Sequence, residues 1–162
     1  ALGAFVRTAR ALPDGVAAMS LEELLRTSDV VVVATELNDR TRGMLGAGEL
    51  ALMKPDVVFV NIARGAISND HALARLAAER PAMRLALDVF DPEPLDISSP
   101  LRALGNAILT PHMVGHTRDT FDRMPLILLE NVERALVGEV PQFVCNPAVV
   151  EGWSGKWREG AV

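Results

Sequence analysis

The chain contains 162 residues, a length typical of about one domain. Asp and Glu total 21 against 16 Lys and Arg, and this net charge of −5 argues against a protein that tracks nucleic-acid phosphates. Hydrophobic residues make up 49% of the chain, too many for a disordered protein. The lone Cys145 excludes an internal disulfide and a multi-cysteine metal site, and it favours a reducing compartment. No apolar run approaches the ~20 residues of a membrane span, so we expect a soluble, cytoplasmic protein that binds no metal, membrane or nucleic acid.

Strands and helices are expected in alternation along the chain. Residues 5–8 form the first expected strand. Ser20-Leu-Glu-Glu23 is a capping box, in which a hydroxyl and a carboxylate bind free backbone N–H groups, and it predicts a short helix. Pro125 falls inside the last expected helix and should kink or divide it. The other expected elements are strands at 29–34, 57–61, 83–88 and 107–110, helices at 48–53, 69–79 and 117–137, and a tail without regular structure at 140–162.

The strand expected at 29–34 indicates the fold class. It is β-branched and apolar on both faces, which is typical of a strand covered by helices on each side, and hence of a parallel sheet. Strands that alternate with helices predict an α/β protein with a doubly wound, Rossmann-like parallel sheet and right-handed crossovers. Such sheets bind ligands outside the carboxyl ends of their strands.

Polar side chains follow the expected strands where each one ends. They are Thr35 after the first, Arg64 after the next, Asp88 and Glu93 after the third, and His112 after the last. Taken singly, each has an ordinary explanation as a solvated or hydrogen-bonded loop residue. Because the carboxyl ends of parallel strands share one edge, however, we expect an arginine, two acids and a histidine to meet there.

This set predicts reduction of a carbonyl group next to a carboxylate. The Arg64 guanidinium can bind a carboxylate through two hydrogen bonds and polarise the neighbouring C=O. His112 can donate a proton to the oxygen as hydride reaches the carbon. A nearby carboxylate would stabilise the imidazolium and set its tautomer. The hydride itself calls for a nicotinamide cofactor.

Three blocks of sequence resemble one family. They are 24–31, 53–65, and 87–94 continued by 109–112. In this order they are similar to the D-isomer-specific 2-hydroxyacid dehydrogenases, which include phosphoglycerate dehydrogenase, glyoxylate/hydroxypyruvate reductase and D-lactate dehydrogenase. The resemblance runs from about residue 1 to 147, nearly the whole chain.

The resemblance implies roles for individual residues. Arg64 matches the substrate-binding arginine, His112 the acid/base, and Glu93 its carboxylate partner. Glu93 also separates the chain from formate dehydrogenases of the same fold, which resemble this pattern but pair the histidine with glutamine. Two of the implied cofactor contacts have a specific place: Asp88 would meet the carboxamide, and Gly115 would end a segment that closes over the nicotinamide ring. The cofactor-binding positions implied are Thr35, Ile62, Ala63, Arg64, Asp88, His112 and Gly115.

The phosphate-binding G-x-G-x-x-G turn of the family is missing. Gly43, Gly46 and Gly48 have the wrong spacing and follow no expected strand. By resemblance that turn lies upstream of residue 1, behind a substrate domain. We therefore expect 1–138 to be a nucleotide-binding domain without its first βα unit, and 139–162 to be a tail that returns toward the absent substrate domain. Such a fragment should be catalytically inactive by itself, because the helix N-terminus that binds pyrophosphate is lacking.

The choice of cofactor depends on Arg10. NAD-preferring members carry an acid after the second strand, where it holds the ribose hydroxyls. Alignment places Arg10 at or near that position, which favours NADP(H) over NAD(H) because arginine attracts a 2′-phosphate; the alternative is a surface arginine and a shifted alignment. Near the adenosine side, Ala34 and Glu36 replace a polar residue and a proline that the family usually has, which weakens the assignment of Thr35.

Two other functions fit the same residues. Dehydrogenase-like corepressors and scaffolds use this fold to bind nicotinamide without turnover, and a truncated remnant would have no function. An intact arginine, glutamate and histidine favour the enzyme over a remnant. The resemblance also implies a small 2-oxoacid or 2-hydroxyacid substrate and a homodimer, whereas the residues that would select the substrate lie mostly outside this chain.

Overall fold

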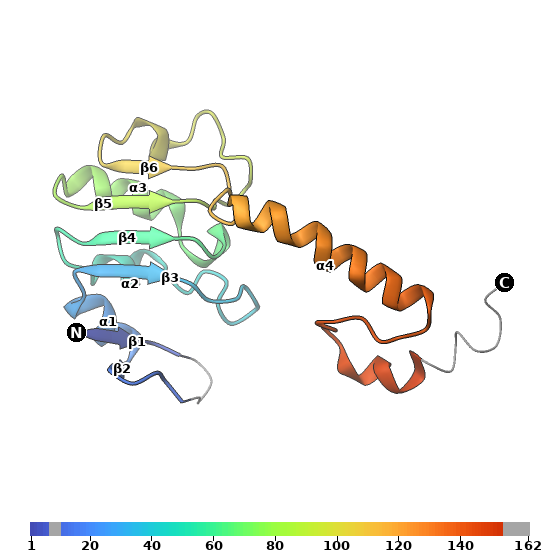
Figure 1. Ribbon diagram of the computed structural model, residues 1–162. Coiled ribbons are helices and arrows are strands. Elements are labelled where there is room, and N and C mark those ends of the chain that lie inside the picture. Colours follow the sequence, from blue (N-terminus) through green and yellow to red (C-terminus); the bar gives the residue numbers. More distant parts are fainter. Residues whose placement is uncertain (7–10, 154–162) are drawn as a thin grey trace. The chain divides into compact units, whose positions relative to one another are not determined.

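The computed structural model describes residues 1–6 and 11–153 (Figure 1). The described residues form two compact units, the first ending at Val114 and the second beginning at Gly115. The boundary that the sequence suggests at residue 138 separates functional parts rather than packed units, and it stays a prediction.

The first unit is built on a four-stranded parallel sheet in the order β3-β4-β5-β6. Asn61 pairs with Val33 on one side and with Leu87 on the other, so the carboxyl ends of the strands are level. This arrangement confirms the expected α/β class with a parallel sheet. The strands are β3 (Val30–Val33), β4 (Val58–Asn61), β5 (Arg84–Leu87) and β6 (Ala107–Leu109).

Two α-helices and two 3-10 turns connect these strands, and a third helix, α1, precedes β3. Ser20 Oγ accepts a hydrogen bond from the Glu23 N–H at 3.2 Å, as the capping box predicts. Asn69 Oδ1 accepts from the Ala72 N–H at 2.8 Å and starts the next long helix in the same way. The elements are α1 (Leu21–Thr27), α2 (Ala47–Ala51), η1 (Gly65–Ile67), α3 (Asp70–Glu79) and η2 (Pro100–Ala103).

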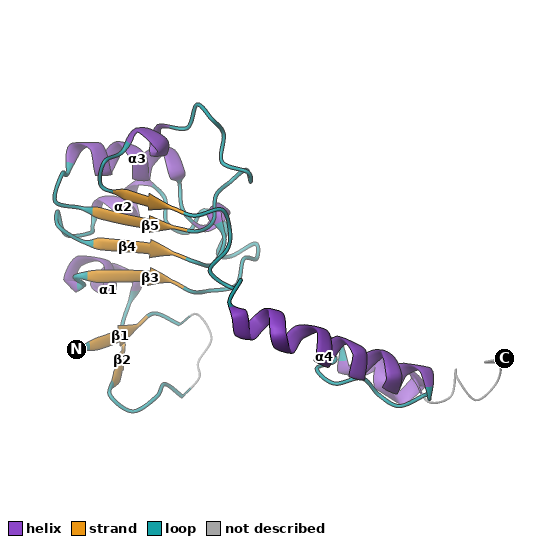
Figure 2. Ribbon diagram, turned by 45° about the horizontal axis from the view of Figure 1, so that its top comes forward, coloured by secondary structure: helices purple, strands orange, loops and turns teal. Residues whose placement is uncertain are grey.

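The helices α2 and α3 cover one face of the sheet (Figures 1 and 2). Strands in sequential order, joined by right-handed crossovers, place their connections on the same side. Val31 and Val33 accordingly are 4% and 5% exposed, whereas Val30 and Val32, on the opposite face, are 55% and 53% exposed. The expectation that residues 29–34 are covered on both faces is therefore wrong for the described residues. Side-chain type shows what a strand is able to bury, but the connections decide which face is covered.

The core lies between the sheet and these helices. Phe59, at the centre of β4, is fully buried, and Leu25 of α1 and Leu73 of α3 are buried as completely. Aliphatic side chains provide most of the remaining core, as the low aromatic content predicts. The other buried members include Leu45, Leu50, Met53, Val57, Ile67, Ala74, Ala77, Met83, Leu85, Leu87 and Leu101.

Two short strands near the N-terminus form a separate parallel pair. They are β1 (Leu2–Ala4) and β2 (Val16–Ala18). The strand expected at 5–8 is thus misplaced: the strand precedes Phe5, Phe5 and Val6 are not part of it, and residues 7 and 8 lie outside the described residues. An apolar run does not show where a strand begins or ends, because backbone pairing with a partner sets those limits.

The second unit consists of α4 (Arg118–Leu136) and a folded tail. The helix continues through Pro125 as one element, so it is not divided there, and the kink expected as the alternative stays a prediction. The tail contains η3 (Pro147–Gly152), so the expectation that it has no regular structure is wrong. Backbone carbonyls attach it: Arg134 Nε donates to Val140 O at 3.0 Å, and Trp153 Nε1 donates to Glu139 O at 3.0 Å. Of the helices formed by residues 1–6 and 11–153, none is long and apolar enough for a bilayer span.

We predict that a substitution on the covered face of the sheet lowers the free energy of unfolding more than one on the exposed face. Phe59→Ala removes a fully buried ring and should lower the free energy of unfolding by about 3–5 kcal/mol. Val32→Ala, on the open face, should lower it by less than about 1 kcal/mol. Urea denaturation monitored by circular dichroism measures both values. Equal losses would contradict the one-sided core.

Candidate active site

Asn61 shapes the turn that carries Arg64. This asparagine ends β4 and is 1% exposed. Its Nδ2 donates to Arg64 O at 3.2 Å and to Ser68 Oγ at 3.3 Å, while its Oδ1 accepts from the Ala63 N–H at 3.1 Å. Arg64 lies at the carboxyl edge, as predicted, and its Nη1 donates to Ala63 O at 2.6 Å. The sequence pattern identified Asn61 only as a strand end, because a buried amide that binds three partners has no signature of its own.

Gly65 brings two strand ends into direct backbone contact. A Cβ built on this residue would overlap the carbonyl carbon and oxygen of Phe90, so a glycine is required here for steric reasons. Phe90 belongs to the loop after β5, and Gly65 to the loop after β4. The contact therefore holds the segment of Arg64 against the segment of Glu93, and sequence analysis did not predict it.

His112 and Glu93 form the expected pair. The distance from His112 Nδ1 to Glu93 Oε2 is 2.8 Å, and Glu93 Oε1 accepts from the Phe90 N–H at 3.0 Å. The hydrogen bond from His112, together with the Phe90 amide, lowers the pKa of Glu93 and outweighs the effect of desolvation; the positive charge of Arg64 acts in the same direction. Glu93 is therefore ionised and accepts the Nδ1 proton. The other ring nitrogen, Nε2, is then available for chemistry.

Asp88 holds the segment that follows His112. Its carboxylate is 3% exposed and accepts from Thr110 Oγ1 at 2.6 Å, from the Met113 N–H at 2.8 Å and from the Val114 N–H at 2.9 Å. Burial by itself would raise the pKa of Asp88, but these three hydrogen bonds outweigh it and the pKa is lowered.

The backbone of His112 is held in the same way. Its N–H donates to Asp88 O at 2.8 Å, and its φ of 54° lies in the left-handed region. Asp88 thus fixes the backbone of the histidine through its own carbonyl and the two following residues through its carboxylate. The contact with a carboxamide that the resemblance implies stays a prediction.

A cavity of about 280 Å³ brings the three candidate catalytic residues together. Arg42 also borders it, and sequence analysis did not single this residue out. The segment that carries Arg42 runs beside the loop after β4, where the Gly43 N–H donates to Ala66 O at 2.8 Å. The lining residues are Leu37, Arg42, Arg64, Gly65, Ala66, Phe90, Asp91, Glu93 and His112.

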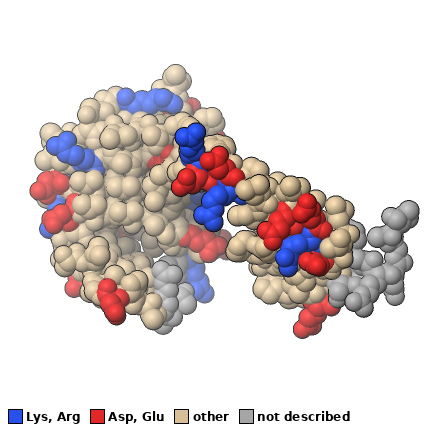
Figure 3. All heavy atoms as spheres, in the orientation of Figure 1, with Lys and Arg blue, Asp and Glu red and all other residues tan. Residues whose placement is uncertain are grey.

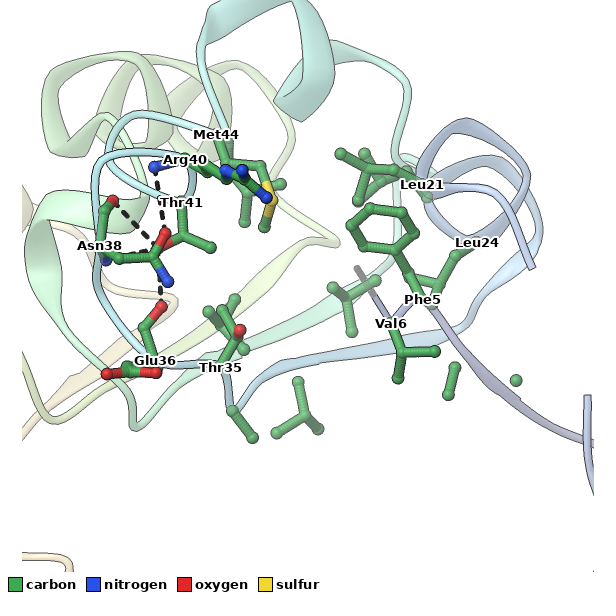
Figure 4. A pocket seen from close by; sticks show the side chains of 18 residues that line it. Phe5, Val6, Leu21, Leu24, Thr35, Glu36, Asn38, Arg40, Thr41 and Met44 are labelled. Carbon is green, nitrogen blue, oxygen red and sulfur yellow. Dashed lines mark hydrogen bonds between the residues drawn. The ribbon is translucent and has the colours of Figure 1, made fainter. Parts of the chain in front are cut away.

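A larger cavity of about 550 Å³ is lined by residues of β1, α1 and β3 and by the segment that follows β3 (Figure 4). Thr35 is one of its lining residues, and the contact of Thr35 with a cofactor stays a prediction. Thr41 organises its polar wall, because Thr41 Oγ1 donates to Glu36 O at 2.6 Å and accepts from the Asn38 N–H at 2.8 Å. Across from this wall lie apolar side chains of the segment that follows β1 and of α1: Phe5, Val6, Leu21 and Leu24. An apolar wall facing a polar one fits a flat, hydrogen-bonding ring such as adenine.

The remaining predicted positions are less central. Ile62, 39% exposed, and Ala63, which is buried, lie directly after β4 but line neither of these two cavities. Gly115 begins the second unit, so its place at the site stays a prediction. Arg10 lies outside the described residues. Gly43 lies in a loop, Gly46 is the N-cap of α2 and Gly48 lies within that helix, so none of them belongs to a turn directly after a strand.

Within the described ranges no group of three or more His, Cys, Asp and Glu side chains is placed to hold a metal ion. On the face of the first unit seen in Figure 3, basic and acidic side chains are interspersed rather than gathered by sign.

Comparison with known proteins agrees with this geometry. Residues 4–114 match the family model described as D-isomer specific 2-hydroxyacid dehydrogenase, NAD binding domain. The chain belongs to this family. Its parallel sheet and helices are those of a partial Rossmann-like NAD-binding domain, and the family assignment made from the sequence is confirmed.

Two curated relatives share 34% to 42% sequence identity with this chain. The chain is 42% identical over 132 residues to a glyoxylate reductase of Aeropyrum pernix, covering 82% of this chain and 39% of that protein. It is 34% identical over 131 residues to glyoxylate/hydroxypyruvate reductase B of Shigella boydii, covering 81% and 40%. The chain therefore spans about two fifths of the length of these relatives.

A solved structure is similar over most of the chain. The D-isomer specific 2-hydroxyacid dehydrogenase of Xanthobacter autotrophicus, crystallised with NADPH and MES, is 32% identical with a TM-score of 0.71. The match covers 90% of this chain and 61% of that one.

We predict that a side chain at Gly65 disturbs the site. Gly65→Ala should lower the free energy of unfolding by about 1–3 kcal/mol, because the methyl group displaces the Phe90 backbone. Gly48→Ala is the control: nothing lies within 4 Å of its Cβ position in α2, so it should be neutral or stabilising by up to about 1 kcal/mol. Chemical denaturation measures both, and a neutral Gly65→Ala would contradict the contact.

We also predict a pH dependence from Asp88. Because the folded state depresses the pKa of this carboxyl, its stabilising contribution is fully present above about pH 4, the ordinary aspartate value, and is lost as the pH falls through the depressed value. The difference in unfolding free energy between wild type and Asp88→Asn should therefore be large at neutral pH and shrink in acid. Asp56→Asn, at an exposed turn, should show no such trend. Urea titrations at several pH values provide the test.

Proposed function

We propose that this chain supplies the acid–base residues and the nucleotide-binding sheet of an NAD(P)-dependent oxidoreductase that interconverts small 2-oxoacids and D-2-hydroxyacids. The observation that carries the proposal is the His112–Glu93 pair, at 2.8 Å, beside Arg64 in one cavity. Family membership supports the reaction class, and the relatives named above reduce glyoxylate or hydroxypyruvate.

Each of the three residues has a distinct chemical task. Arg64 retains guanidinium N–H groups beyond the one bound to Ala63 O, and these bind the substrate carboxylate and orient the adjacent carbonyl. When a nicotinamide cofactor is bound, it supplies or accepts the hydride at that carbon. His112 delivers its Nε2 proton to the carbonyl oxygen during reduction and removes it during oxidation. Glu93 sets the tautomer and stabilises the imidazolium.

The cofactor would span the carboxyl edge of the sheet. The cavity lined by Thr35 suits its adenosine end, and the positions of Ile62, Ala63, Asp88 and Gly115 are proposed for its nicotinamide end. We propose NADP(H) over NAD(H), because Arg10 replaces the acid that would hold the ribose hydroxyls.

We predict that Arg64 governs substrate binding. In protein expressed from its native gene, Arg64→Ala should raise KM for glyoxylate or hydroxypyruvate about 100-fold or more, because a bidentate charged contact is lost. Arg84→Ala, an exposed arginine at the opposite end of β5, should leave KM unchanged. Cofactor binding without turnover of any 2-oxoacid by the unmodified protein would contradict the enzyme and favour a nicotinamide-binding corepressor or scaffold.

We predict that Arg10 selects the cofactor. Arg10→Asp should lower the ratio of kcat/KM for NADPH to that for NADH about tenfold or more, because a charged hydrogen bond to the 2′-phosphate is worth roughly 1.5–3 kcal/mol. Steady-state kinetics with both cofactors measures the ratio, and Arg84→Asp is the charge-matched control. An unchanged ratio would rule out the NADP assignment.

We further propose that these 162 residues need the rest of the enzyme for turnover, since they cover only 39% of the Aeropyrum relative. Appreciable turnover by the pure 162-residue chain would refute this.

A further inference from the structure

Two consecutive backbone amides in the loop after β5 are bound by two different carboxylates. The Phe90 N–H donates to Glu93 Oε1 at 3.0 Å. The next amide, that of Asp91, donates to Asp70 Oδ2 at 3.4 Å. Glu93 pairs with His112, so the amide of Phe90 is one contact away from the proposed acid/base. Asp70 is not a lining residue of the cavity, and no task in the proposed mechanism requires it.

Asp70 belongs to the same continuous segment as Arg64. It is the first residue of α3, directly after the cap residue Asn69, and η1 connects it to the arginine. The segment meets the loop of Glu93 at two points: Gly65 lies against the Phe90 backbone, and Asp70 binds the Asp91 amide. Sterics alone act at the first point, whereas the second is a polar contact that depends on charge.

We propose that Asp70 is a positioning residue for Glu93: by holding the Asp91 amide it fixes the peptide whose neighbouring amide orients the Glu93 carboxylate toward His112. The inference rests on the proposed function for the role of Glu93 in the reaction. It adds α3 to the elements that determine the geometry of the acid–base pair.

The electrostatics make this contact sensitive to pH. Burial raises the pKa of Asp70 to about 6, against the lowering effect of the Asp91 amide. The groups facing it are the Asp91 carboxylate, which raises the pKa further, and His71, which lowers it. The carboxylate is a stronger acceptor than the neutral acid. The loop should therefore be held more firmly as the pH rises through 6.

The raised pKa has the opposite effect on global stability. The folded state binds the Asp70 proton more tightly than the unfolded state does, so the stability contributed by this group is present at low pH. That contribution is lost as the pH rises from about 4, the ordinary aspartate value, through the folded value near 6.

NMR of the uniformly ¹⁵N-labelled 162-residue chain tests the proposal without cofactor or substrate. The Asp91 amide should titrate with a midpoint near pH 6, and this titration should be absent in Asp70→Asn. In Asp70→Ala the Phe90 amide should exchange with solvent up to about tenfold faster at neutral pH, because its partner Glu93 is less well placed. Glu79→Ala, at the exposed end of α3, should leave that exchange rate unchanged.

Either of two results would overturn the proposal: an Asp91 amide whose pH titration is the same in Asp70→Asn as in the unmodified chain, or a Phe90 exchange rate in Asp70→Ala equal to that of Glu79→Ala. If Asp70→Ala does not fold, the near-isosteric Asp70→Asn takes its place. Its amide oxygen is a weaker acceptor than the carboxylate, so the Phe90 amide should again exchange faster than in Glu79→Ala, by a smaller factor. Failure of the proposed enzyme function would appear separately, as cofactor binding without turnover, while these amide measurements remained as expected.

Discussion

The level, parallel pairing of four strands is the constraint on which the rest of this structure depends. Because Asn61 pairs with both Val33 and Leu87, the loops after β3, β4 and β5 begin at the same height. The catalytic candidates, separated by up to 48 residues between Arg64 and His112, become neighbours for this reason alone. A strand shifted by one residue would turn its side chains to the other face and separate them.

Short polar contacts then convert this common edge into a defined geometry. Asn61 shapes the turn before Gly65, Gly65 packs on Phe90, and the Phe90 amide binds Glu93. The backbone carbonyl of Asp88 holds the backbone of His112 by accepting its N–H. The arginine, the glutamate and the histidine are thus each held by a neighbour that need not react, which is what preorganisation of a site requires.

Three carboxyl groups near this edge titrate differently because their surroundings differ. Hydrogen-bond donors lower the pKa of Asp88 and of Glu93 and keep them ionised as acceptors. Asp70 accepts one long hydrogen bond, from the Asp91 amide, among the described residues, and burial raises its pKa to about 6. The number and quality of donors at each carboxylate, rather than depth alone, decides the direction of the shift.

The sequence by itself determined the family, the α/β class, the four strands of the main sheet and the candidates Arg64, Glu93 and His112. These follow from local signals: β-branched runs, Asn and Ser caps, and a motif read residue by residue. Only the tertiary structure decided that the sheet is covered on one face within the described residues, that β1 begins before Phe5, and that α4 continues through Pro125. It alone also revealed the contacts of Gly65 and Asp70 with the loop of Glu93. The physical reason is the same in each case. Strand pairing, crossover direction and close backbone approach join residues distant in sequence, and no local pattern records which partner a residue will meet.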